Sequence, residues 1–455
     1  MRILLVSCYE LGHQPLAVAS PLAFLGRAGF AAEALDISVE QFDAGKAAGA
    51  GLAAISVPMH TALRLGVRVA AEIRRVNPAC HICFYGLYAS LNAEYLLGHS
   101  GDSVIGGEFE SALVALAEAL VAGRPGAVEG VHLRAHAAGP VLERLSFPVP
   151  IRDALPQLRK YAHLDKDGRR GLVGYVEASR GCLHLCLHCP IPPVYGGRFF
   201  VVPQEVVLAD IRQLVRDGAT HITFGDPDFL NGPGHSLAIV RAMHAEFPSL
   251  TFDFTAKVEH ILELGDLFPE LRARGCAFMI SAVESLSETV LANLEKGHTR
   301  ADVARALEIV RGAGIAFRPT WVAFTPWTTL EDYLDMFEFV EREGLIDHVD
   351  SVQFTLRLLV PPGSALLTRE AIRPHVGTLD QAAFIHRWTH PDPRMDQLQR
   401  QASRLVEATS AADAAATFYR LKALAYSTAG LPLQPEPALA PDRRRPPRLT
   451  EAWFC

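Results

Sequence analysis

Short apolar runs alternate with amphipathic stretches through the first 125 residues. The runs MRILLVSC, LAAISVPM and HICFYG have the apolar character of buried strands. The spacing of apolar residues after them predicts helices over 61–76, 89–97 and 110–122, and we expect an earlier helix over 21–28. Strands that alternate with helices predict an α/β fold with a doubly wound parallel sheet, here a Rossmann-like domain over 1–125. In such sheets ligands bind outside the carboxyl ends of the strands.

A second alternation with longer units begins at residue 171. The apolar runs GLVGYVEAS, HITFGD, FDFTAKV, AFMISAV, FRPTWVAF and HVDSVQFTLRL are separated by helical patterns. Six such units, where a complete barrel has eight, predict a partial TIM-type (βα)6 barrel over 171–365 with its site at the strand carboxyl ends. Residues 126–170 are predicted to connect the two domains. Residues 366–455 are predicted to be helical, with one long helix over 392–425 that Asp392 caps, and to end in a cysteine-bearing tail.

Composition and charge bear on which partners the protein binds and on where in the cell it is expected. The 455 residues are 49% hydrophobic and 20% charged, which is typical of a globular protein with two or three domains. A formal net charge of −7 gives no general attraction to nucleic acid or anionic lipid. We find no apolar run of bilayer length and no cleavage site after the first apolar run, so we expect a cytoplasmic protein without membrane or nucleic-acid partners.

The chemistry concentrates in SRGCLHLCLHCP, at the end of the first strand of the second region. Cys182, Cys186 and Cys189 stand within eight positions of a chain that has eight cysteines and no export signal, which favours metal binding over disulfides. Three thiolates without an evident fourth leave one iron of a 4Fe-4S cluster open to an external ligand. Two other interpretations stay open: a zinc site that includes His184 or His188, or cysteines that only fill the core.

The Cys-x-x-x-Cys-x-x-Cys spacing on a loop after a strand resembles the radical S-adenosylmethionine (SAM) superfamily, and residues 171–360 resemble it throughout. The resemblance implies that SAM binds the open iron through its amino and carboxylate groups. One electron from the cluster then breaks a carbon–sulfur bond of SAM. His188 stands where the superfamily usually has an aromatic residue, and its imidazole can pack on adenine.

The same resemblance implies further SAM-binding residues after the second and third strands. HITFGDPDF stands where the superfamily places its Gly-Gly-Glu motif, so Asp226 and Asp228 resemble the carboxylates that accept hydrogen bonds from the SAM ammonium group. Lys257, in FDFTAKVEH, stands where an arginine is common, and a cation there can meet the SAM carboxylate. A turn-forming aspartate and a solvated lysine are the structural alternatives.

The later strands carry the second strongest match. ISAVESLSETVLANLEKGHT resembles the stretch that approaches the SAM ribose, which implies Glu284 and Ser285. Arg318, in FRPTW, is a weaker candidate for cofactor binding. Gln353 and Arg357 are expected to point into the barrel mouth if they lie on the inward-facing side of their strand. Ion pairs on the surface would explain Arg318 and Arg357 equally well.

The first region resembles the cobalamin-binding domain of cobalamin-dependent radical SAM enzymes. SVPMHTA, FYGLYAS and VIGGEFES would be the loops around the corrin. The Asp-x-His-x-x-Gly motif that supplies a cobalt ligand in many cobalamin proteins is missing, and we interpret His13 and His60 as ordinary loop histidines. Cobalamin bound without a protein ligand and a domain that has lost the cofactor both agree with this region.

The whole chain is also similar to radical SAM proteins with cysteine-bearing tails, a group that includes the arsinothricin biosynthesis enzyme. That similarity implies transfer of a 3-amino-3-carboxypropyl group from SAM to trivalent arsenic, with Cys455 and Cys276 as the candidate catalytic thiols. Taken together, the residues predict an enzyme that transfers a SAM-derived carbon group to a small molecule. It would need an electron donor such as flavodoxin or ferredoxin. A non-catalytic metal or cofactor sensor on the same plan is the alternative of another class.

Overall fold

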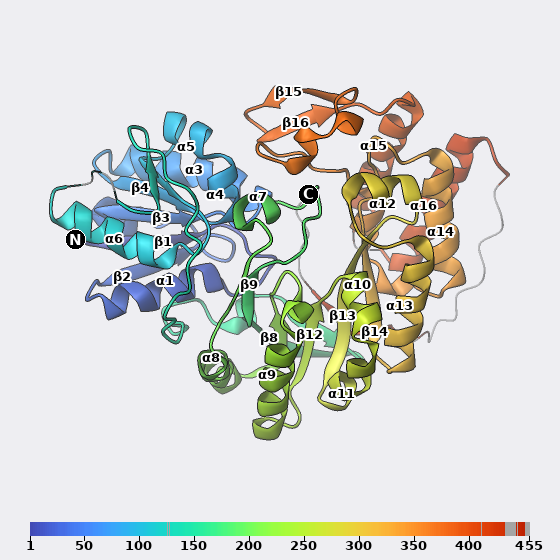
Figure 1. Cartoon of the computed structure of the whole chain (residues 1–455), viewed down its shortest axis with the longest axis horizontal. Coiled ribbons are helices and arrows are strands. Elements are labelled where there is room, and N and C mark those ends of the chain that lie inside the picture. The colour runs from blue at the N-terminus through green and yellow to red at the C-terminus, as the bar shows by residue number, and fades with distance from the viewer. Residues whose placement is uncertain (125, 127, 411, 433–442, 444, 451–455) are drawn as a thin grey trace.

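The N-terminal sheet has the strand order of a doubly wound fold (Figure 1). The structure is a computed structural model that describes all residues except 125, 127, 411, 433–442, 444 and 451–455. Within that part of the chain, six strands pair in the order β2-β1-β3-β4-β5-β6, all parallel except β5 with β6. The order reverses between β1 and β3, where such sheets bind ligands. The elements are β1 Ile3–Ser7, α1 Leu16–Arg27, β2 Ala32–Asp36, α2 Ala44–Gly49, β3 Leu52–Ser56, α3 His60–Val76, β4 His81–Tyr85, α4 Leu87–Leu91, α5 Ala93–His99, β5 Ser103–Ile105, α6 Glu110–Val121 and β6 Val131–Leu133.

Strand β1 shows why this sheet is buried on both faces. Leu4 and Val6 pack in one apolar cluster with α2, α3 and α5, whereas Ile3 and Leu5 pack in a second cluster with α1 and α6. Successive strand residues point to opposite faces, so a strand covered by helices on both sides is apolar throughout. The predicted α/β class with a parallel sheet is confirmed.

Helix α1 begins earlier than we expected. Instead of spanning 21–28 it spans Leu16–Arg27, with Pro21 inside it. Proline cannot donate the hydrogen bond that would reach Ala17 O in a regular helix. The Tyr85 hydroxyl donates to that carbonyl instead, at 2.7 Å. A tertiary contact that the local sequence does not show therefore permits proline in the helix interior.

The second sheet curls into a half-barrel with helices on its outer side (Figure 1). Seven strands of the described chain pair in the order β14-β13-β12-β11-β8-β7-β17, and β8, β11, β12, β13 and β14 are parallel. The elements are η1 Leu158–Lys160, β7 His163–Lys166, β8 Arg169–Val176, β9 Ser179–Gly181, α7 Pro192–Tyr195, β10 Phe199–Val201, α8 Gln204–Arg216, β11 Ala219–Phe224, η2 Phe229–Asn231, α9 Pro233–Glu246, β12 Thr251–Thr255, α10 Val258–Glu263, η3 Gly265–Leu267, α11 Phe268–Ala273, β13 Cys276–Glu284, α12 Glu288–Leu294, α13 Arg300–Gly312, β14 Ala316–Trp321, α14 Leu330–Arg342 and β17 Arg448–Leu449.

The sixth predicted strand is absent from this sheet as the described residues form it. HVDSVQFTLRL contains the 3₁₀ turns η4 Ile346–His348 and η5 Ser351–Thr355, followed by one parallel bridge between Phe324 and Arg357. The Gln353 side chain accepts a hydrogen bond from Trp321 N on the edge strand β14, at 3.0 Å. A side chain thus satisfies the edge amide that a sixth strand would have paired. The prediction of a partial barrel is confirmed.

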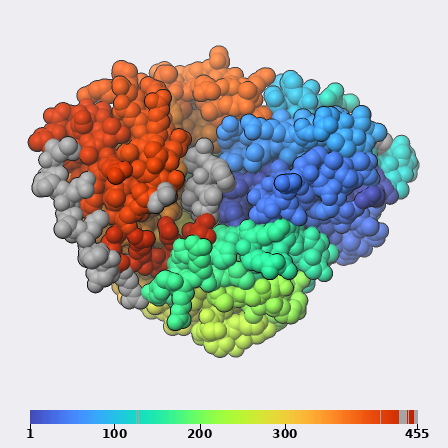
Figure 2. All heavy atoms as spheres, turned by 180° about the vertical axis from the view of Figure 1, so that it is seen from behind, coloured from blue at the N-terminus to red at the C-terminus, as the bar shows by residue number. Residues whose placement is uncertain are grey.

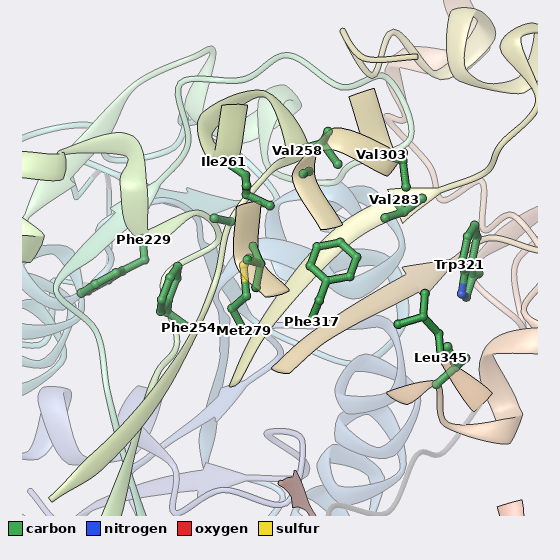
Figure 3. Packing of buried hydrophobic residues seen from close by; sticks show 14 of the residues in the cluster. Phe229, Phe254, Val258, Ile261, Met279, Val283, Val303, Phe317, Trp321 and Leu345 are labelled. Atoms are coloured by element: carbon green, nitrogen blue, oxygen red, sulfur yellow. The ribbon is translucent and has the colours of Figure 1, made fainter. Parts of the chain in front are cut away.

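The largest core lies between the half-barrel and its outer helices. Figure 3 shows Phe254, Met279 and Phe317 from adjacent strands packed against Val258 and Val303 of the covering helices. A smaller apolar cluster lies on the other side of the sheet. Its members are Leu164, Val173, Ala277 and Phe278, with Leu449 of the C-terminal strand β17 against them.

The C-terminal region is only partly helical. It contains η6 Ala365–Thr368, η7 Glu370–Ile372, and an antiparallel hairpin of β15 Val376–Asp380 and β16 Ile385–Trp388. The expected helix over 392–425 is two helices, α15 Pro393–Ala408 and α16 Ala414–Ala429. Asp392 caps α15 as predicted, but Asp413 caps α16 by accepting a hydrogen bond from Ala415 N. Such a cap starts a new helix. None of the helices in the described ranges is long and apolar enough to cross a membrane.

The hairpin joins the C-terminal region to the N-terminal domain, and Figure 1 shows β15 and β16 next to α4 and α5. Phe384, in the turn of the hairpin, is buried in the apolar cluster of the N-terminal sheet and meets the Tyr95 ring edge-on at 4.8 Å. His60 Nε2 lies 2.7 Å from Ala383 O. The C-terminal region and the N-terminal domain are therefore in direct contact through the hairpin.

Two buried arginines hold the N-terminal part of the chain against the half-barrel. Arg152 donates two hydrogen bonds to the carboxylate of Asp210 in α8, at 2.9 and 2.7 Å, and one to Tyr175 O in β8. Arg180 donates to Glu110, the first residue of α6, at 2.8 and 3.0 Å. A buried charge is tolerated only when it is paired in this way, so these contacts fix the arrangement of the domains.

We expect Arg152→Met to lower the free energy of unfolding by about 3–5 kcal/mol, because it leaves the Asp210 carboxylate buried without its partner. Urea denaturation followed by circular dichroism measures this change. Arg212→Met is the matched control, since it removes the same two-bond contact with a carboxylate on the surface, to Glu246, and should leave the midpoint nearly unchanged. Equal shifts in the two variants would contradict a structural role for the buried pair.

Candidate functional site

The predicted thiol loop lies at the carboxyl end of β8. After β8 the chain forms the short antiparallel pair β9–β10, and the loop 182–189 runs from β9 toward α7. Gly181, immediately before the loop, has φ +76°, and a Cβ there would lie 2.4 Å from Arg198 O. Only glycine fits this close approach. Arg198 O in turn accepts a hydrogen bond from Cys182 N at 3.1 Å, so the backbone fixes where the first thiol stands.

The three predicted cluster ligands are gathered on this loop. Cys182 and Cys186 are buried and Cys189 is partly so. Burial raises the pKa of Cys182 and raises that of Cys189 to about 12, and the neighbouring thiols add to both shifts. The thiols are therefore close enough to interact electrostatically, and they bind metal as thiolates only if the metal displaces their protons.

The sulfur atoms of the three thiols do not all lie within 4.8 Å of one another. Zinc–sulfur bonds of about 2.3 Å bring tetrahedral ligand atoms to about 3.8 Å from one another. Among the described residues, the group of His, Cys, Asp and Glu ligand atoms that all lie within 4.8 Å is His184, Asp228 and His260, and no thiol belongs to it. The structure thus favours a multi-iron cluster on the trio over a zinc site shared with His184 or His188.

Asp226 stabilises the turn that carries the thiols. Its carboxylate accepts hydrogen bonds from Ala178 N at 2.9 Å and from the Ser179 hydroxyl at 2.6 Å, and the residue is 2% exposed. Burial raises its pKa to about 7, although these donors oppose the shift. We predicted that Asp226 would accept from the SAM ammonium group. In the structure its oxygens are already bonded inside the protein.

Asp228 is also occupied by neighbouring donors. One oxygen accepts from Leu230 N at 2.9 Å, and the other accepts from Lys257 N at 3.1 Å and lies 2.9 Å from His260 Nδ1. His184 Nε2 lies 3.4 Å from the second oxygen. Asp228 therefore connects the loops after β8, β11 and β12 instead of presenting a free carboxylate.

Lys257 lies beside the thiol loop as expected. Its Nζ lies 2.8 Å from Glu259 Oε2 and 3.3 Å from His184 Nδ1, and the residue is 8% exposed. It is therefore a held cation at the carboxyl end of β12 and not a solvated surface lysine.

Glu284 and His188 form a second cluster on the other side of the loop. His188 Nε2 lies 3.2 Å from Glu284 Oε1, and Lys296 Nζ donates to the same oxygen at 3.4 Å. Burial alone would raise the pKa of Glu284, but Lys296 and His188 outweigh it and lower the pKa to about 2. Glu284 has φ +64°, a conformation that non-glycine residues rarely adopt outside functional sites. The structure thus holds an anion close to the thiol loop.

Lys296 was not singled out by the sequence, although it lies in the LEKGHT segment of the stretch that suggested Glu284. His260 was likewise overlooked in FDFTAKVEH, and it lies in α10. Each becomes recognisable only through its partner on another element, because Lys296 and Glu284 are twelve positions apart and His260 and Asp228 thirty-two.

The remaining candidates lie farther along the barrel strands. Ser285 follows Glu284, and its hydroxyl accepts from Ser287 N at 3.1 Å. Arg318 lies in the middle of β14, buried, and donates to Asp350 at 3.0 Å. Arg357 donates to Asp396 and to Trp388 O, both at 2.6 Å, with its guanidinium over the Trp388 ring. The two arginines therefore have protein partners and are not brought to the thiol loop.

Neither candidate catalytic thiol, Cys276 or Cys455, is seen at the thiol loop in the described part of the chain. Cys276 opens β13, whereas Glu284 ends it, so Cys276 lies at the opposite end of the strand from the site, and it is fully buried. The structure therefore does not bring Cys276 to the thiol loop. Cys455 lies outside the described residues. Cys8, Cys80 and Cys83 are buried in the N-terminal sheet, as free cysteines in apolar strands usually are.

His13 and His60 follow strands of the N-terminal sheet, in the region that resembles a cobalamin-binding domain, and both contact other parts of the protein. His13 stacks on Tyr175 of β8 with 4.7 Å between ring centroids, and His60 contacts Ala383 O. The glycines of VIGGEFES pack closely against other parts of the protein, so they do not border an open space for a ligand. A Cβ at Gly107 would lie 2.1 Å from Val141 O. Neither the histidines nor this glycine show a prepared corrin site.

Comparison with known proteins places these features in a family. Residues 176–340 match the family model described as the Radical SAM superfamily. A putative methylthiotransferase of Methanocaldococcus jannaschii is 22% identical over 217 residues, 45% of each chain. A tRNA-2-methylthio-N(6)-dimethylallyladenosine synthase of Magnetococcus marinus is 23% identical over 46% of this chain and 49% of its own. The alignments span about half the length of these curated relatives.

Two solved structures share the fold over most of the chain. OxsB, a cobalamin-dependent SAM radical enzyme, matches 90% of this chain and 67% of its own with a TM-score of 0.70 and 15% identity. TsrM, a radical SAM methyltransferase from Kitasatospora setae, matches 90% and 89% with a TM-score of 0.68 and 18% identity. Residues 176–340 thus match the Radical SAM superfamily model, and the chain shares its fold with OxsB and TsrM.

Proposed function

We propose that this chain holds a 4Fe-4S cluster on Cys182, Cys186 and Cys189, binds SAM at the iron left open, and transfers a SAM-derived carbon group to a small molecule. The observation that carries the proposal is the trio of thiols gathered on one loop at the carboxyl edge of the half-barrel. When bound, the cluster and SAM would supply one-electron cleavage of a carbon–sulfur bond. A one-electron reductant such as reduced flavodoxin or ferredoxin would serve it.

The residues around the loop have distinct roles in this proposal. Glu284 stays anionic because Lys296 lies beside it, so its free oxygen can accept hydrogen bonds from the SAM ribose hydroxyls. His188 orients that carboxylate and offers a ring for adenine to pack on. Lys257 can exchange its contact with Glu259 for the SAM carboxylate. Asp226 acts by holding the turn before Cys182 and does not touch SAM.

The group transferred distinguishes two forms of the proposal. The likeness to TsrM, a radical SAM methyltransferase whose structure is also known with cobalamin bound, favours methyl transfer that depends on cobalamin. His13 and His60 have protein partners and supply no cobalt ligand, so a corrin would have to bind here without one. Transfer of the 3-amino-3-carboxypropyl group, with trivalent arsenic as acceptor, is the other form. It depends on Cys455, since Cys276 is sealed in the core.

Anaerobic reconstitution with iron and sulfide should give the broad absorption of a 4Fe-4S cluster in the wild-type protein and its near-complete loss in Cys186→Ala. The reduced wild-type protein should consume SAM. Cys80→Ala removes another buried thiol and should behave as the wild type. A protein that takes up only zinc and leaves SAM intact would instead be the sensor, and the proposed enzyme would be ruled out.

Glu284→Gln should weaken SAM binding by about 10- to 100-fold, because it replaces a hydrogen bond to a charged acceptor worth about 1.5–3 kcal/mol. Equilibrium binding of SAM to cluster-loaded protein measures the change, with the cluster absorption as a check that the thiol loop is intact. Glu308→Gln, on the exposed face of α13, is the control. Unchanged SAM affinity in Glu284→Gln would remove Glu284 from the SAM site.

The products of SAM cleavage should separate the two forms of transfer. Methylthioadenosine implies aminocarboxypropyl transfer, whereas S-adenosylhomocysteine together with 5′-deoxyadenosine implies cobalamin-dependent methylation. We expect the second pattern, accompanied by a corrinoid spectrum after purification from cells supplied with cobalamin. Methylthioadenosine from protein without corrinoid would contradict methyl transfer and favour the aminocarboxypropyl form.

A further inference from the structure

Three metal-ligating side chains converge beside the thiol loop without including a thiol. They are His184 on the loop itself, Asp228 after β11 and His260 in α10. We propose that they bind one divalent transition-metal ion of the zinc class, at a site separate from the cysteine trio. Two imidazoles and one carboxylate form a donor set that suits such ions. The proposal does not depend on SAM binding or cleavage.

The distances among the three ligand atoms suit one ion. Asp228 Oδ2 lies 3.4 Å from His184 Nε2 and 2.9 Å from His260 Nδ1, and all three atoms lie within 4.8 Å of one another. Metal–ligand bonds of about 2.0–2.1 Å in tetrahedral geometry place ligand atoms about 3.3 Å apart. Shifts of a few tenths of an ångström in the short contact and about 1.5 Å at most in the longest one would complete that geometry.

His184 Nε2 is the observation that points to a ligand. This buried nitrogen lies 3.4 Å from Asp228 Oδ2 and makes no well-formed hydrogen bond among the described residues. A buried polar atom without a partner costs free energy. A metal ion between His184 and Asp228 would use the nitrogen lone pair and relieve that cost.

The other side of the His184 ring has the partner that metal-binding histidines usually have. Glu259 Oε2 lies 3.7 Å from His184 Nδ1, close enough to accept a hydrogen bond after a small movement. Lys257 Nζ, which can only donate, lies nearer to the same nitrogen, at 3.3 Å. Glu259 therefore keeps Nδ1 protonated and leaves Nε2 to the metal only when Lys257 bonds Glu259 alone. Lys257 Nζ, 2.8 Å from the same carboxylate oxygen, fixes Glu259 in place.

Two backbone amides hold the carboxylate of the site, and its two imidazole rings pack together. Asp228 is held by Leu230 N and Lys257 N, and the His184 and His260 rings lie 4.6 Å apart. The two histidine side chains are 16% and 12% exposed. Three protein ligands with partial access to solvent leave a coordination position open, as in catalytic zinc sites. A small molecule with a nitrogen, oxygen or sulfur donor could therefore bind the ion there.

The test uses the full chain with its thiols already occupied by the reconstituted cluster, to which one equivalent of zinc is added before desalting. We expect one zinc per chain, and zinc X-ray absorption should show nitrogen and oxygen neighbours at about 2.0–2.1 Å with no sulfur. His260→Ala should lose the zinc while keeping its iron. Glu259→Gln should weaken zinc binding by about 10- to 100-fold. His99→Ala, on the surface of α5, should change nothing.

The proposal is overturned if no zinc is retained, if the zinc has sulfur neighbours, or if His260→Ala retains it as tightly as the wild type. A variant with Cys182, Cys186 and Cys189 all changed to alanine separates this outcome from the proposed function. It should bind no cluster and still bind one zinc through nitrogen and oxygen. If the chain forms no cluster at all, that variant alone decides whether the zinc site exists.

Discussion

The hydrogen bonds that the buried Asp226 carboxylate accepts from Ala178 N and the Ser179 hydroxyl are the contact on which the site depends. They tie the end of β11 to the turn after β8, two residues before Gly181 brings Cys182 against Arg198 O. This link fixes the start of the thiol loop relative to β11, and His184 and His188 hold the rest of the loop against Asp228 and Glu284. The Asp228 contacts extend the same arrangement to β12, so successive strand ends are joined side by side.

Much of the fold follows from local pattern, and the departures have identifiable causes. The runs ILLVS and HICFY are almost wholly apolar and buried, apart from Ser7 and His81, because helices cover both faces of the sheet. Pro21 stands inside α1 because the Tyr85 hydroxyl bonds the carbonyl that proline leaves free. Gln353 replaces a sixth strand by bonding Trp321 N. Contacts between residues distant in sequence decided both cases, and local periodicity does not contain them.

Site residues could be predicted where they stand in a closely spaced sequence motif. They could not be predicted where they act through a partner that lies far away in the sequence. The cysteine spacing and VESLSE led to Cys182, Cys186, Cys189 and Glu284. The partners Lys296 and His260 belong to other elements and carry no spacing signal of their own. Conversely, Asp226 matched a motif position, yet the structure uses its oxygens to hold the backbone. Residue type at a strand end indicates a site, but hydrogen-bond partners decide the role.

The central claim, an open-coordinated 4Fe-4S cluster on three thiolates, is tested most directly by electron paramagnetic resonance of the reduced, reconstituted protein with and without SAM. The account predicts a cluster signal whose g values shift when SAM is added, because SAM would bind the iron that no cysteine holds. A cluster signal that SAM leaves unchanged, or a protein that forms no such cluster, would contradict it.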